Sequence, residues 1–469
     1  MTHAADIVVL GAGPAGLGLA YRAAGAGHRV VVVEREEHVG GASASFTVAG
    51  LRVDHGSHRL HRTIAPQILA ELRHLLGNDL QRRQRRGRIR LADRWLPFPL
   101  TPIATARNLP PGFGVRAALE ATTSWARRPR ADTFAQVVRS GLGPTMAERF
   151  YEPYARKLWG LDPERISGEQ ARRRIGATGP AAIVRRMVAG RDPDARTFLY
   201  PRRGFGQLWE SLAEAAAGRG VTLALGRTAT AIDLDSGGVT AHLDDGRRLD
   251  GRHLFSTVPL PVLVRLLRPA PPDDVITAAA RLRTRAMVLA YLVLDTPRYT
   301  PYDAHYLPET WTPVTRISEP KNYRDGHAGP HDDGDPPDRT VLCAEIPCSR
   351  DDATWRADDH IVGGIVADTL RRAGLPDATV AQVTTRRLPS AYPVYDLGFE
   401  ERLTRVDTWM RTLSGVTTYG RQGLFVHDNS HHALAMAWAA ADALRPDGTI
   451  DATAWTNARG RFAQHVVED

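Results

Sequence analysis

One segment near the start of the chain, "DIVVLGAGPAGLGLAYRAAGAGHRVVVVE", constrains the fold more than any other. It predicts a strand over Asp6–Leu10, a helix from Pro14 to about Ala24, and a second strand over Arg29–Glu34. Both strands are continuous apolar runs, as expected of parallel strands that are covered on both faces. The glycines between the strand and the helix therefore predict the first βαβ unit of a Rossmann-like α/β domain.

Gly11, Gly13 and Gly16 form the pattern G-x-G-x-x-G between that strand and that helix. Gly11 allows the tight turn, Gly13 lets the backbone approach a pyrophosphate, and Gly16 lets the helix and strand pack closely. The N–H groups at the helix N-terminus, where the helix dipole favours negative charge, would bind the pyrophosphate. Glu34 ends the next strand and can accept hydrogen bonds from ribose hydroxyls. The pattern predicts a dinucleotide site.

Composition narrows the class of protein without choosing a function. A hydrophobic content of 43% and a charged content of 24% are typical of a globular protein. The formal net charge of +9 favours an anionic partner, although an arginine bias from a GC-rich genome would have the same effect. The length of 469 residues favours two domains, sequential or interleaved.

The two cysteines, Cys343 and Cys348, are too few for a disulfide framework, and no histidine motif stands beside them. This usage predicts a reducing compartment and no metal centre. The N-terminus lacks the features of a signal peptide, and no apolar run approaches the ~20 residues needed to span a bilayer. We therefore expect a cytoplasmic protein without a transmembrane segment.

The densest run of charge is "QRRQRRGRIR" at residues 81–90. Such a run is usually a solvated face, and no aromatic interleaving or nucleic-acid module accompanies it. We expect no nucleic-acid partner. A nucleic-acid binder that uses the arginines, and a dinucleotide-binding protein without enzymatic activity, remain alternatives.

The choice between NAD and FAD depends on "VGGASASF" at residues 39–46, which supplies Gly40 and Gly41 soon after Glu34. This stretch resembles flavoproteins of the amine oxidase and glutathione reductase type, in which the glycine pair lets the chain pass close to the flavin. The later segment from "TATAIDLD" to "STVP" also resembles these families, and there the backbone around Ala229 would contact the adenine. The resemblance implies FAD as the cofactor.

Further segments resemble UDP-galactopyranose mutase and its FAD-dependent oxidoreductase relatives. They are "DHGSHRLHRT", "LPFPL", "FYEPYARKLWG", "TRISEPKNY", "AYPVYDLG" and "TYGRQGLFVHDNSHH". The first places His58 and His61 at the two histidine positions of that family, beside the flavin. The last segment would start a helix, with Asn429 or Ser430 as its cap, whose positive end points at the flavin. The match covers nearly the whole chain.

Lysine usage singles out two of these segments. The chain has 61 basic residues, and only Lys157 and Lys321 are lysines. If arginine replaces lysine wherever a generic cation suffices, then these two positions need a compact ammonium group, which the planar guanidinium does not imitate. Coincidence is the alternative interpretation.

The sequence and the resemblance together imply an α/β fold. It combines a Rossmann-like FAD/NAD(P)-binding domain of the glutathione reductase type with an interleaved α+β substrate domain. We expect the FAD-binding domain over residues 1–78, 200–268 and 390–469. A helical substrate or lid region would span 79–199, and an antiparallel sheet that binds substrate would span 269–389.

The resemblance also implies the site residues. The FAD contacts would be Gly11, Gly13, Ala15, Gly16, Glu34, Arg35, Gly40, Gly41, Ser43, His58, Ala229, Gly420, Arg421, Asp428, Asn429 and Ser430. The catalytic residues would be His58, His61, Arg316 and Lys321. The substrate contacts would be Tyr154, Lys157, Trp159, Arg174, Arg316 and Tyr395, with Arg173 as an alternative to Arg174.

Two reactions fit this scaffold. In the first, a sugar-like or biosynthetic intermediate loses a hydride to the flavin N5. In the second, reduced flavin N5 attacks a nucleotide sugar, and the ring recloses in another size without net redox change. The chain departs from the mutases where Phe425 and His427 stand in place of tyrosines and "CAEIPCS" replaces a tyrosine pair. We therefore favour the oxidoreductase, with a small, anionic substrate such as a nucleotide sugar, held by Arg316.

Overall fold

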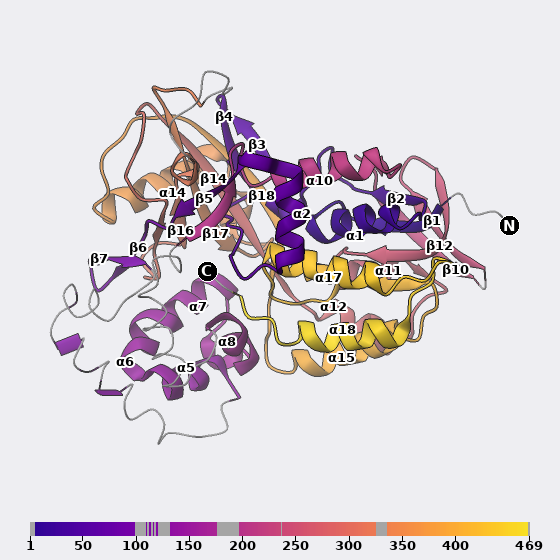
Figure 1. Ribbon diagram of the computed structural model, residues 1–469. Coiled ribbons are helices and arrows are strands. Elements are labelled where there is room, and N and C mark those ends of the chain that lie inside the picture. Colours follow the sequence, from indigo (N-terminus) through magenta and orange to yellow (C-terminus); the bar gives the residue numbers. More distant parts are fainter. Residues whose placement is uncertain are drawn as a thin grey trace.

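The structure of the protein is a computed structural model. It describes residues 5–98, 109, 112–113, 116, 119–120, 132–175, 197–235, 237–324 and 335–467. Two large sheets, two two-stranded sheets and the helices around them make up the described part (Figure 1). Part of the helical stretch expected between residues 104 and 190 lies outside the described residues, as does most of the loop expected at 324–340.

The first sheet has eight strands, with the order β13-β10-β11-β12-β1-β2-β9, and β19 pairs with the end of β12. Its centre is parallel, because β1 pairs in parallel with both β12 and β2. The strands β10, β11 and β12 form an antiparallel meander at one side. The bounds are β1 Ala5–Leu10, β2 Val30–Val33, β9 Thr222–Ala224, β10 Ala229–Asp235, β11 Gly238–Leu243, β12 Arg248–Ser256, β13 Leu267–Arg268 and β19 Val416–Thr418.

Helices cover both faces of this sheet, as the apolar strand runs predicted. Ile7 and Val9 pack toward one group of helices, and Val8 and Leu10 pack toward the other. The first group is α1 Pro14–Gly25, α2 Pro66–Leu76, α10 Gln207–Gly218, α17 Ser430–Asp442 and α18 Ala452–Phe462. The second is α11 Leu260–Leu266, α12 Asp273–Ala280 and α15 Phe399–Met410.

The second sheet has seven strands, with the order β18-β14-β17-β16-β15-β6-β7. Helix α14 (Asp359–Arg372) packs on one face, and the hairpin of β3 (Ser45–Val48) and β4 (Leu51–Asp54) packs on the other. All neighbours are antiparallel except β15 and β6. The bounds are β6 Gly87–Leu91, β7 Arg94–Phe98, β14 Thr284–Leu294, β15 Ala304–Tyr306, β16 Arg316–Ser318, β17 Thr340–Cys348 and β18 Val380–Pro393.

The region expected to be helical, residues 79–199, also supplies strands. Strands β6 and β7 extend the second sheet, and β5 (Leu80–Gln84) pairs with β8 (Thr197–Pro201). Its helices form a separate group below the second sheet in Figure 1, around Phe134 and Trp159. They are α5 Phe134–Leu142, α6 Pro144–Met146, α7 Glu152–Trp159 and α8 Gly168–Ile175, with a π-helical turn over Ala147–Tyr151.

Short elements complete the described chain. They are α13 Ala353–Arg356, α16 Gly420–Gly423 and 3-10 turns at Gly41–Ser43, Gly77–Asp79, Pro163–Arg165 and Pro320–Tyr323. Both cysteines lie buried in β17 as free thiols. Among the described residues, no helix is long and apolar enough to cross a membrane.

Local sequence patterns predicted several elements that the structure contains. They also predicted one helix cap whose hydrogen bonds differ from those expected. The strand–helix–strand start, the helix over Gln207–Gly218 and the hairpin between β11 and β12 are all present. Ser167 and Gln170 have the spacing of a capping box, and Ser167 Oγ does accept the N–H of Glu169 (3.2 Å). Gln170 does not bond back, because the carbonyl of Tyr395 already takes the Ser167 N–H (2.7 Å). The Gln170 amide pairs with His427 instead (2.9 Å).

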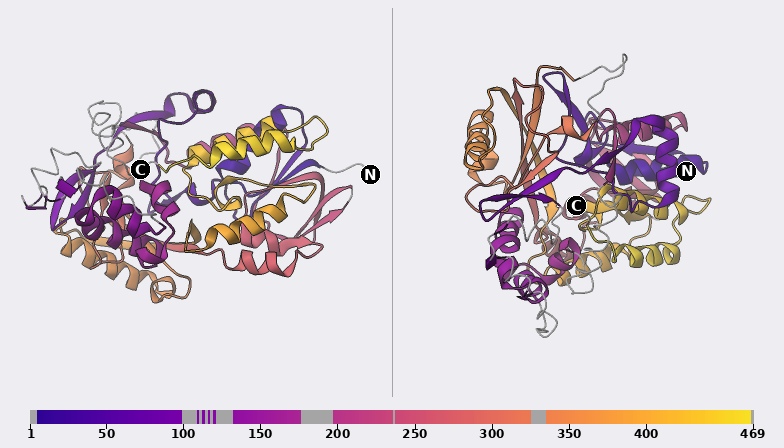
Figure 2. Two further views of the ribbon diagram at one scale, coloured as in Figure 1. Left: turned by 90° about the horizontal axis from the view of Figure 1, so that it is seen from below. Right: turned by 60° about the vertical axis from the view of Figure 1, so that its left-hand side comes forward.

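The segment after α18 returns to the middle of the molecule, where the two sheets and the helices α5–α8 approach one another (Figures 1 and 2). The N–H of Val467 donates there to the carbonyl of Arg173 on α8 (3.0 Å). The C-terminal segment therefore contacts the helical group through Val467, and through His465 it contacts Asp428, the residue before Asn429 (3.3 Å).

Candidate active site

The glycine turn between β1 and α1 has the close contacts that its sequence predicts. Gly11 has a φ of +101°, and a Cβ on it would lie 2.3 Å from Thr257 Oγ1. A Cβ on Gly16 would lie 1.8 Å from the carbonyl oxygen of Gly11. A Cβ on Gly13, in contrast, would meet nothing within 4 Å. Gly11 and Gly16 are thus required by the protein, whereas Gly13 borders open space at the start of α1.

The N-terminus of α1 has no side-chain cap. Its first N–H groups therefore face outward with the positive end of the helix dipole, which suits an anion. Ala15 stands in this first turn and is buried. The helix start thus fits a pyrophosphate group.

Glu34 and the second glycine pair close around this turn. Glu34 is buried, and its carboxylate accepts the N–H of Ala12 (2.7 Å). The N–H of Gly40 donates to the carbonyl of Ala12 (2.8 Å), and a Cβ on Gly41 would lie 3.4 Å from Gly13 Cα. Both glycine segments therefore meet at the start of α1.

Three other residues that were predicted to contact FAD lie around this turn and make different interactions. They are Ser43, Ala229 and Arg35. The side chain of Ser43 donates to the carbonyl of Gly40 (3.1 Å), which holds the second glycine pair in its turn. Ala229 begins β10, and Arg227 just before it donates its N–H to the carbonyl of Glu34 (2.8 Å). The Arg35 side chain is exposed and pairs with Glu36.

The predicted C-terminal contacts lie beside the same turn. A Cβ on Gly420 would lie 2.9 Å from Ala15 Cβ. Asn429 is the N-cap of α17, as predicted, and its N–H donates to His432 Nδ1 (3.3 Å). Helix α17 packs against α1, and Gly18 permits this because a Cβ there would lie 2.9 Å from Ala437. Two helix N-termini from opposite ends of the chain therefore lie side by side.

The two predicted histidines have different surroundings. His58 Nε2 contacts the carbonyl oxygens of Ala42 (3.1 Å) and His55 (3.0 Å), so Nε2 carries the proton and Nδ1 is left as an acceptor. Burial lowers the pKa of His58, which favours the neutral ring. His61 Nδ1 accepts the N–H of Thr63 (3.3 Å).

Arg316 is held by a buried carboxylate that the sequence did not single out. Its Nη2 donates to both oxygens of Glu345 (2.7 and 2.9 Å) and to the carbonyl of Ser57 (3.2 Å). Glu345 also accepts the N–H of Ser57 (2.8 Å). Burial alone would lower the pKa of Arg316, but Glu345 and the neighbouring tyrosines raise it instead. An anionic substrate at Arg316 would therefore share the guanidinium with Glu345.

A second cationic group surrounds Tyr392 at the end of β18. The guanidinium carbons of Arg174 and Arg421 lie 5.6 and 5.0 Å from the centre of its ring. Arg421 Nη2 donates to the carbonyl of Ala391 (2.7 Å), and burial lowers its pKa. The pKa of His427 lies well below its usual value because of burial and of these arginines. Tyr392 thus joins α8, β18 and α16.

Four residues predicted to contact substrate or to catalyse make contacts within the protein. Lys157 donates to the carbonyls of Leu307, Glu309 and Val314 at 2.5–2.9 Å, and Lys321 donates to those of Pro336 and Arg339 at 2.9 Å. Trp159 packs edge-on against Phe134. The Tyr395 hydroxyl donates to the carbonyl of Phe425 (3.0 Å). The predicted substrate or catalytic role of each of these residues stays a prediction. Their contacts within the protein do not support it.

Tyr154 lies on α7, as do Lys157 and Trp159. It is half-buried, and its ring is nearly parallel to that of Phe150, with centroids 6.1 Å apart.

The sequence did not indicate three residues of this region, Tyr392, Glu345 and Thr257. Tyr392 stands in the same "AYPVY" segment as Tyr395, and only the end of β18 at Pro393 separates their surroundings. Nothing in the local sequence indicates which of the two tyrosines lies beside Arg421.

Comparisons with known proteins agree with this geometry. Residues 14–435 match the family described as flavin containing amine oxidoreductase. Coproporphyrinogen III oxidase of Propionibacterium freudenreichii subsp. freudenreichii is 25% identical over 86% of this chain and 84% of its own length. Phytoene dehydrogenase of Streptomyces griseus is 26% identical over 56% of each chain, so the match spans about half of that relative.

Among solved structures, reduced UDP-galactopyranose mutase superposes with a TM-score of 0.80 at 23% identity, over 99% of this chain and 100% of that one. This likeness extends across both sheets and the helical group. The family match, the uncapped start of α1 and the open space at Gly13 agree on one cofactor. The chain therefore belongs to the flavin-containing amine oxidoreductase family and is an FAD-dependent enzyme.

Proposed function

We propose that the protein oxidises a small anionic substrate by removing a hydride from carbon. Bound FAD would supply the hydride acceptor. Its pyrophosphate would lie at the start of α1, with Glu34 at the adenosine ribose, and the ring would lie near the N-terminus of α17. The other proposed contacts are those that the resemblance implied at the two glycine segments, at β10 and before α17.

The observation that carries the proposal is the pair of guanidiniums, those of Arg174 and Arg421, that both lie within 5.6 Å of the centre of the Tyr392 ring. Neither Arg174 nor Arg421 has a carboxylate partner in the described part of the chain, whereas Arg316 pairs with Glu345 and Arg59 with Asp303. Both arginines are half-buried. Cations that are withdrawn from water without a counterion are costly, and a bound anion would relieve that cost. The pair therefore supports a substrate with a carboxylate or phosphate group.

The charges also discriminate between the two relatives' substrates. Phytoene is a hydrocarbon and would leave both guanidiniums unpaired, whereas coproporphyrinogen III carries carboxylates that could bind them. His58 would act as an acceptor through Nδ1, since its Nε2–H is already bonded to two carbonyls. Arg316 would orient the substrate while Glu345 keeps its guanidinium in place.

A mutase acting on a nucleotide sugar is the second candidate, favoured by the superposition on UDP-galactopyranose mutase over nearly the whole chain. A diphosphate would also suit Arg174 and Arg421. The replacement of two family tyrosines by Phe425 and His427 argues for the oxidoreductase, because Phe425 has no hydroxyl and His427 is bonded to Gln170.

One experiment separates the two reactions. The purified FAD-loaded protein is mixed anaerobically with coproporphyrinogen III, and the flavin absorbance is followed. The oxidoreductase proposal expects bleaching by the substrate and recovery with oxygen. The protein is also reduced with dithionite and incubated with UDP-galactopyranose. Formation of a ring isomer only after reduction, without bleaching by any tested substrate, would overturn the oxidoreductase proposal.

The anion site is tested with Arg174→Ala. Loss of a charge-assisted hydrogen bond costs about 1.5–3 kcal/mol, so KM for an anionic substrate should rise roughly 10- to 100-fold. Arg172→Ala is the matched control, because Arg172 is exposed on the same helix and pairs with Glu169. An equal KM in both variants would remove Arg174 from the site.

A further inference from the structure

Two histidines and an aspartate meet where the segment after α18 returns to the first turn of α17. Asp428 precedes α17, His432 lies in its first turn, and His465 follows α18. Their ligand atoms all lie within 4.8 Å of one another. We propose that these three residues bind a divalent transition-metal cation, with zinc as the best match to two imidazoles and a carboxylate.

The distances suit such an ion. The Nδ1 atoms of His432 and His465 each lie 3.2 Å from Asp428 Oδ1. Bonds of about 2.0–2.2 Å from zinc to nitrogen and oxygen, at the tetrahedral angle, place neighbouring ligand atoms roughly 3.3–3.5 Å apart. The cluster therefore already has close to the spacing of two edges of a zinc tetrahedron.

The carboxylate has only part of the hydrogen bonding that its burial requires, because His465 Nδ1 lies 3.3 Å from Oδ2 while Oδ1 has no hydrogen-bond partner among the described residues. The Asp428 side chain is 1% exposed, and Oδ1 makes no hydrogen bond within the described part of the chain although both imidazoles approach it. The N–H of Asn429 donates to His432 Nδ1, so this nitrogen presents a lone pair rather than a proton. Two acceptor atoms thus face each other at 3.2 Å. A cation between them would satisfy both.

Two features of the cluster limit its affinity for a metal ion. The rings of His432 and His465 are stacked, with centroids 4.2 Å apart and planes 13° apart. One ring must turn, because a metal lies in the plane of each imidazole that binds it. The N-terminus of α17 also repels positive charge, which the Asp428 carboxylate offsets. We therefore expect weaker binding than at a structural zinc site with four protein ligands.

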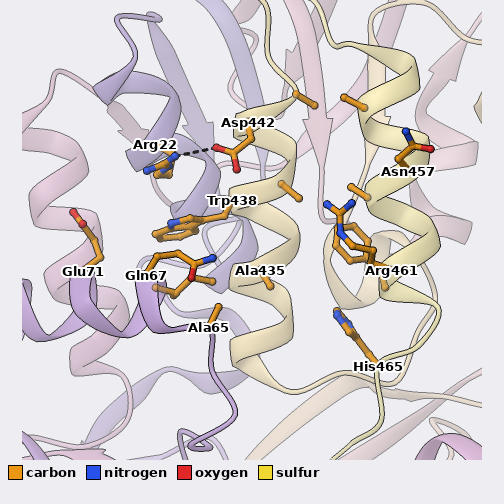
Figure 3. A pocket seen from close by; sticks show the side chains of 16 residues that line it. Arg22, Ala65, Gln67, Glu71, Ala435, Trp438, Asp442, Asn457, Arg461 and His465 are labelled. Carbon is orange, nitrogen blue, oxygen red and sulfur yellow. Dashed lines mark hydrogen bonds and ion pairs between the residues drawn. The ribbon is translucent and has the colours of Figure 1, made fainter.

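The cluster is accessible to solvent. His465 lines a groove of about 840 Å³ between α2, α17 and α18, and Figure 3 shows its imidazole at one end of that groove. The side chains of His432 and His465 are 13% and 18% exposed. The groove offers a path of entry for the ion, and a water molecule can complete its coordination.

The site would fasten the C-terminal segment to the rest of the molecule. Two residues after His465, the N–H of Val467 donates to Arg173 on α8. A cation bound by His465 and by the start of α17 would therefore also hold the connection to α8. Binding should stabilise the folded protein, with a free energy of unfolding that rises with the logarithm of the zinc concentration above the Kd.

The test measures zinc directly. FAD-loaded protein is incubated with zinc chloride, dialysed, and analysed for metal by mass spectrometry. We expect about one zinc per chain in the natural protein, at least ten times less in Asp428→Asn and His465→Ala, and no change in the control His74→Ala on exposed His74 of α2. No zinc uptake, or equal uptake in all variants, would overturn the proposal.

A second measurement is independent of whether the variants fold. Cobalt(II) chloride is titrated into the natural FAD-loaded protein, and absorbance is followed at wavelengths longer than those of the flavin. Bands of four- or five-coordinate cobalt that saturate, and that zinc then removes, are the expected result. A spectrum of hexaaquo cobalt alone would count against the site.

Discussion

At the scale of single residues, the glycines of the first turn differ in whether protein atoms or open space lie beside them. Gly11 and Gly16 are held by the protein itself, because a Cβ on either would strike Thr257 or the backbone. Gly13 has an ordinary φ of −77° and no neighbour within 4 Å. At the start of a helix that suits an anion, this open position leaves room for a ligand.

Gly13→Ala should therefore separate folding from cofactor binding. We expect the apoprotein to unfold within about 1 kcal/mol of the natural protein, since only an N-cap glycine is lost. FAD affinity should fall by roughly 10- to 100-fold, which is about 1.4–2.7 kcal/mol, as the methyl group blocks the pyrophosphate. Fluorescence titration of apoprotein with FAD measures the change.

Gly364→Ala on α14 is the matched control, because a Cβ there also meets nothing within 4 Å and the site lies elsewhere. If FAD binds both variants equally, then the pyrophosphate does not lie at Gly13.

At the scale of elements, Lys157 joins α7 to the second sheet. Its ammonium donates to three carbonyls between residues 307 and 314, and all three N–H groups are used only in the protonated form. Burial lowers the pKa of Lys157 to about 7. Three carbonyls that converge on one atom require a compact donor, which gives a physical reason for lysine in a chain of arginines.

Lys157→Arg should therefore destabilise the protein although charge is conserved. The larger, planar guanidinium has to displace its neighbours and leaves at least one buried carbonyl unpaired, at a cost of about 2–4 kcal/mol. Arg156→Lys on the same helix is the control, since Arg156 is exposed and its pair with Asp162 contributes little. Urea unfolding compares the two variants, and equal stability would disprove this role for Lys157.

At the scale of the whole molecule, buried histidines make stability depend on pH. Burial lowers the pKa of His253 to about 4, and burial with the nearby Arg88 lowers that of His305 to about 3. Both values lie below the unfolded value of 6.5. The stabilisation by the neutral rings is therefore complete above pH 6.5 and is lost as the pH falls toward 4.

His253→Gln should weaken this dependence, because glutamine can still bond to Thr417, which His253 contacts at 2.8 Å, and does not titrate. Between pH 7 and pH 5 the natural protein should lose about 2 kcal/mol more in free energy of unfolding than the variant. Urea unfolding at the two pH values measures it. The exposed His74→Gln should behave like the natural protein, and an unchanged slope in His253→Gln would contradict the burial effect.

Local patterns were sufficient for the elements whose signal lies within about thirty residues. The first βαβ unit, the hairpin before β12, the helix α10 and the Asn429 cap all follow from periodicity, turn residues and capping residues. The pairing of β6 and β7 with the second sheet does not, because strand partners distant in sequence leave no local signal. The sequence therefore predicts a helical region over 79–199 and does not predict which strands β6 and β7 pair with.

The sequence by itself was sufficient to predict a dinucleotide site at the first turn, since the glycine spacing reflects sterics between adjacent atoms of one short segment. Only the tertiary structure decided which charged groups are paired. Glu345 meets Arg316, Arg174 and Arg421 both approach Tyr392, and His465 reaches Asp428, all across dozens to hundreds of residues. Electrostatic interactions act through space, so their partners become known only when the chain has folded.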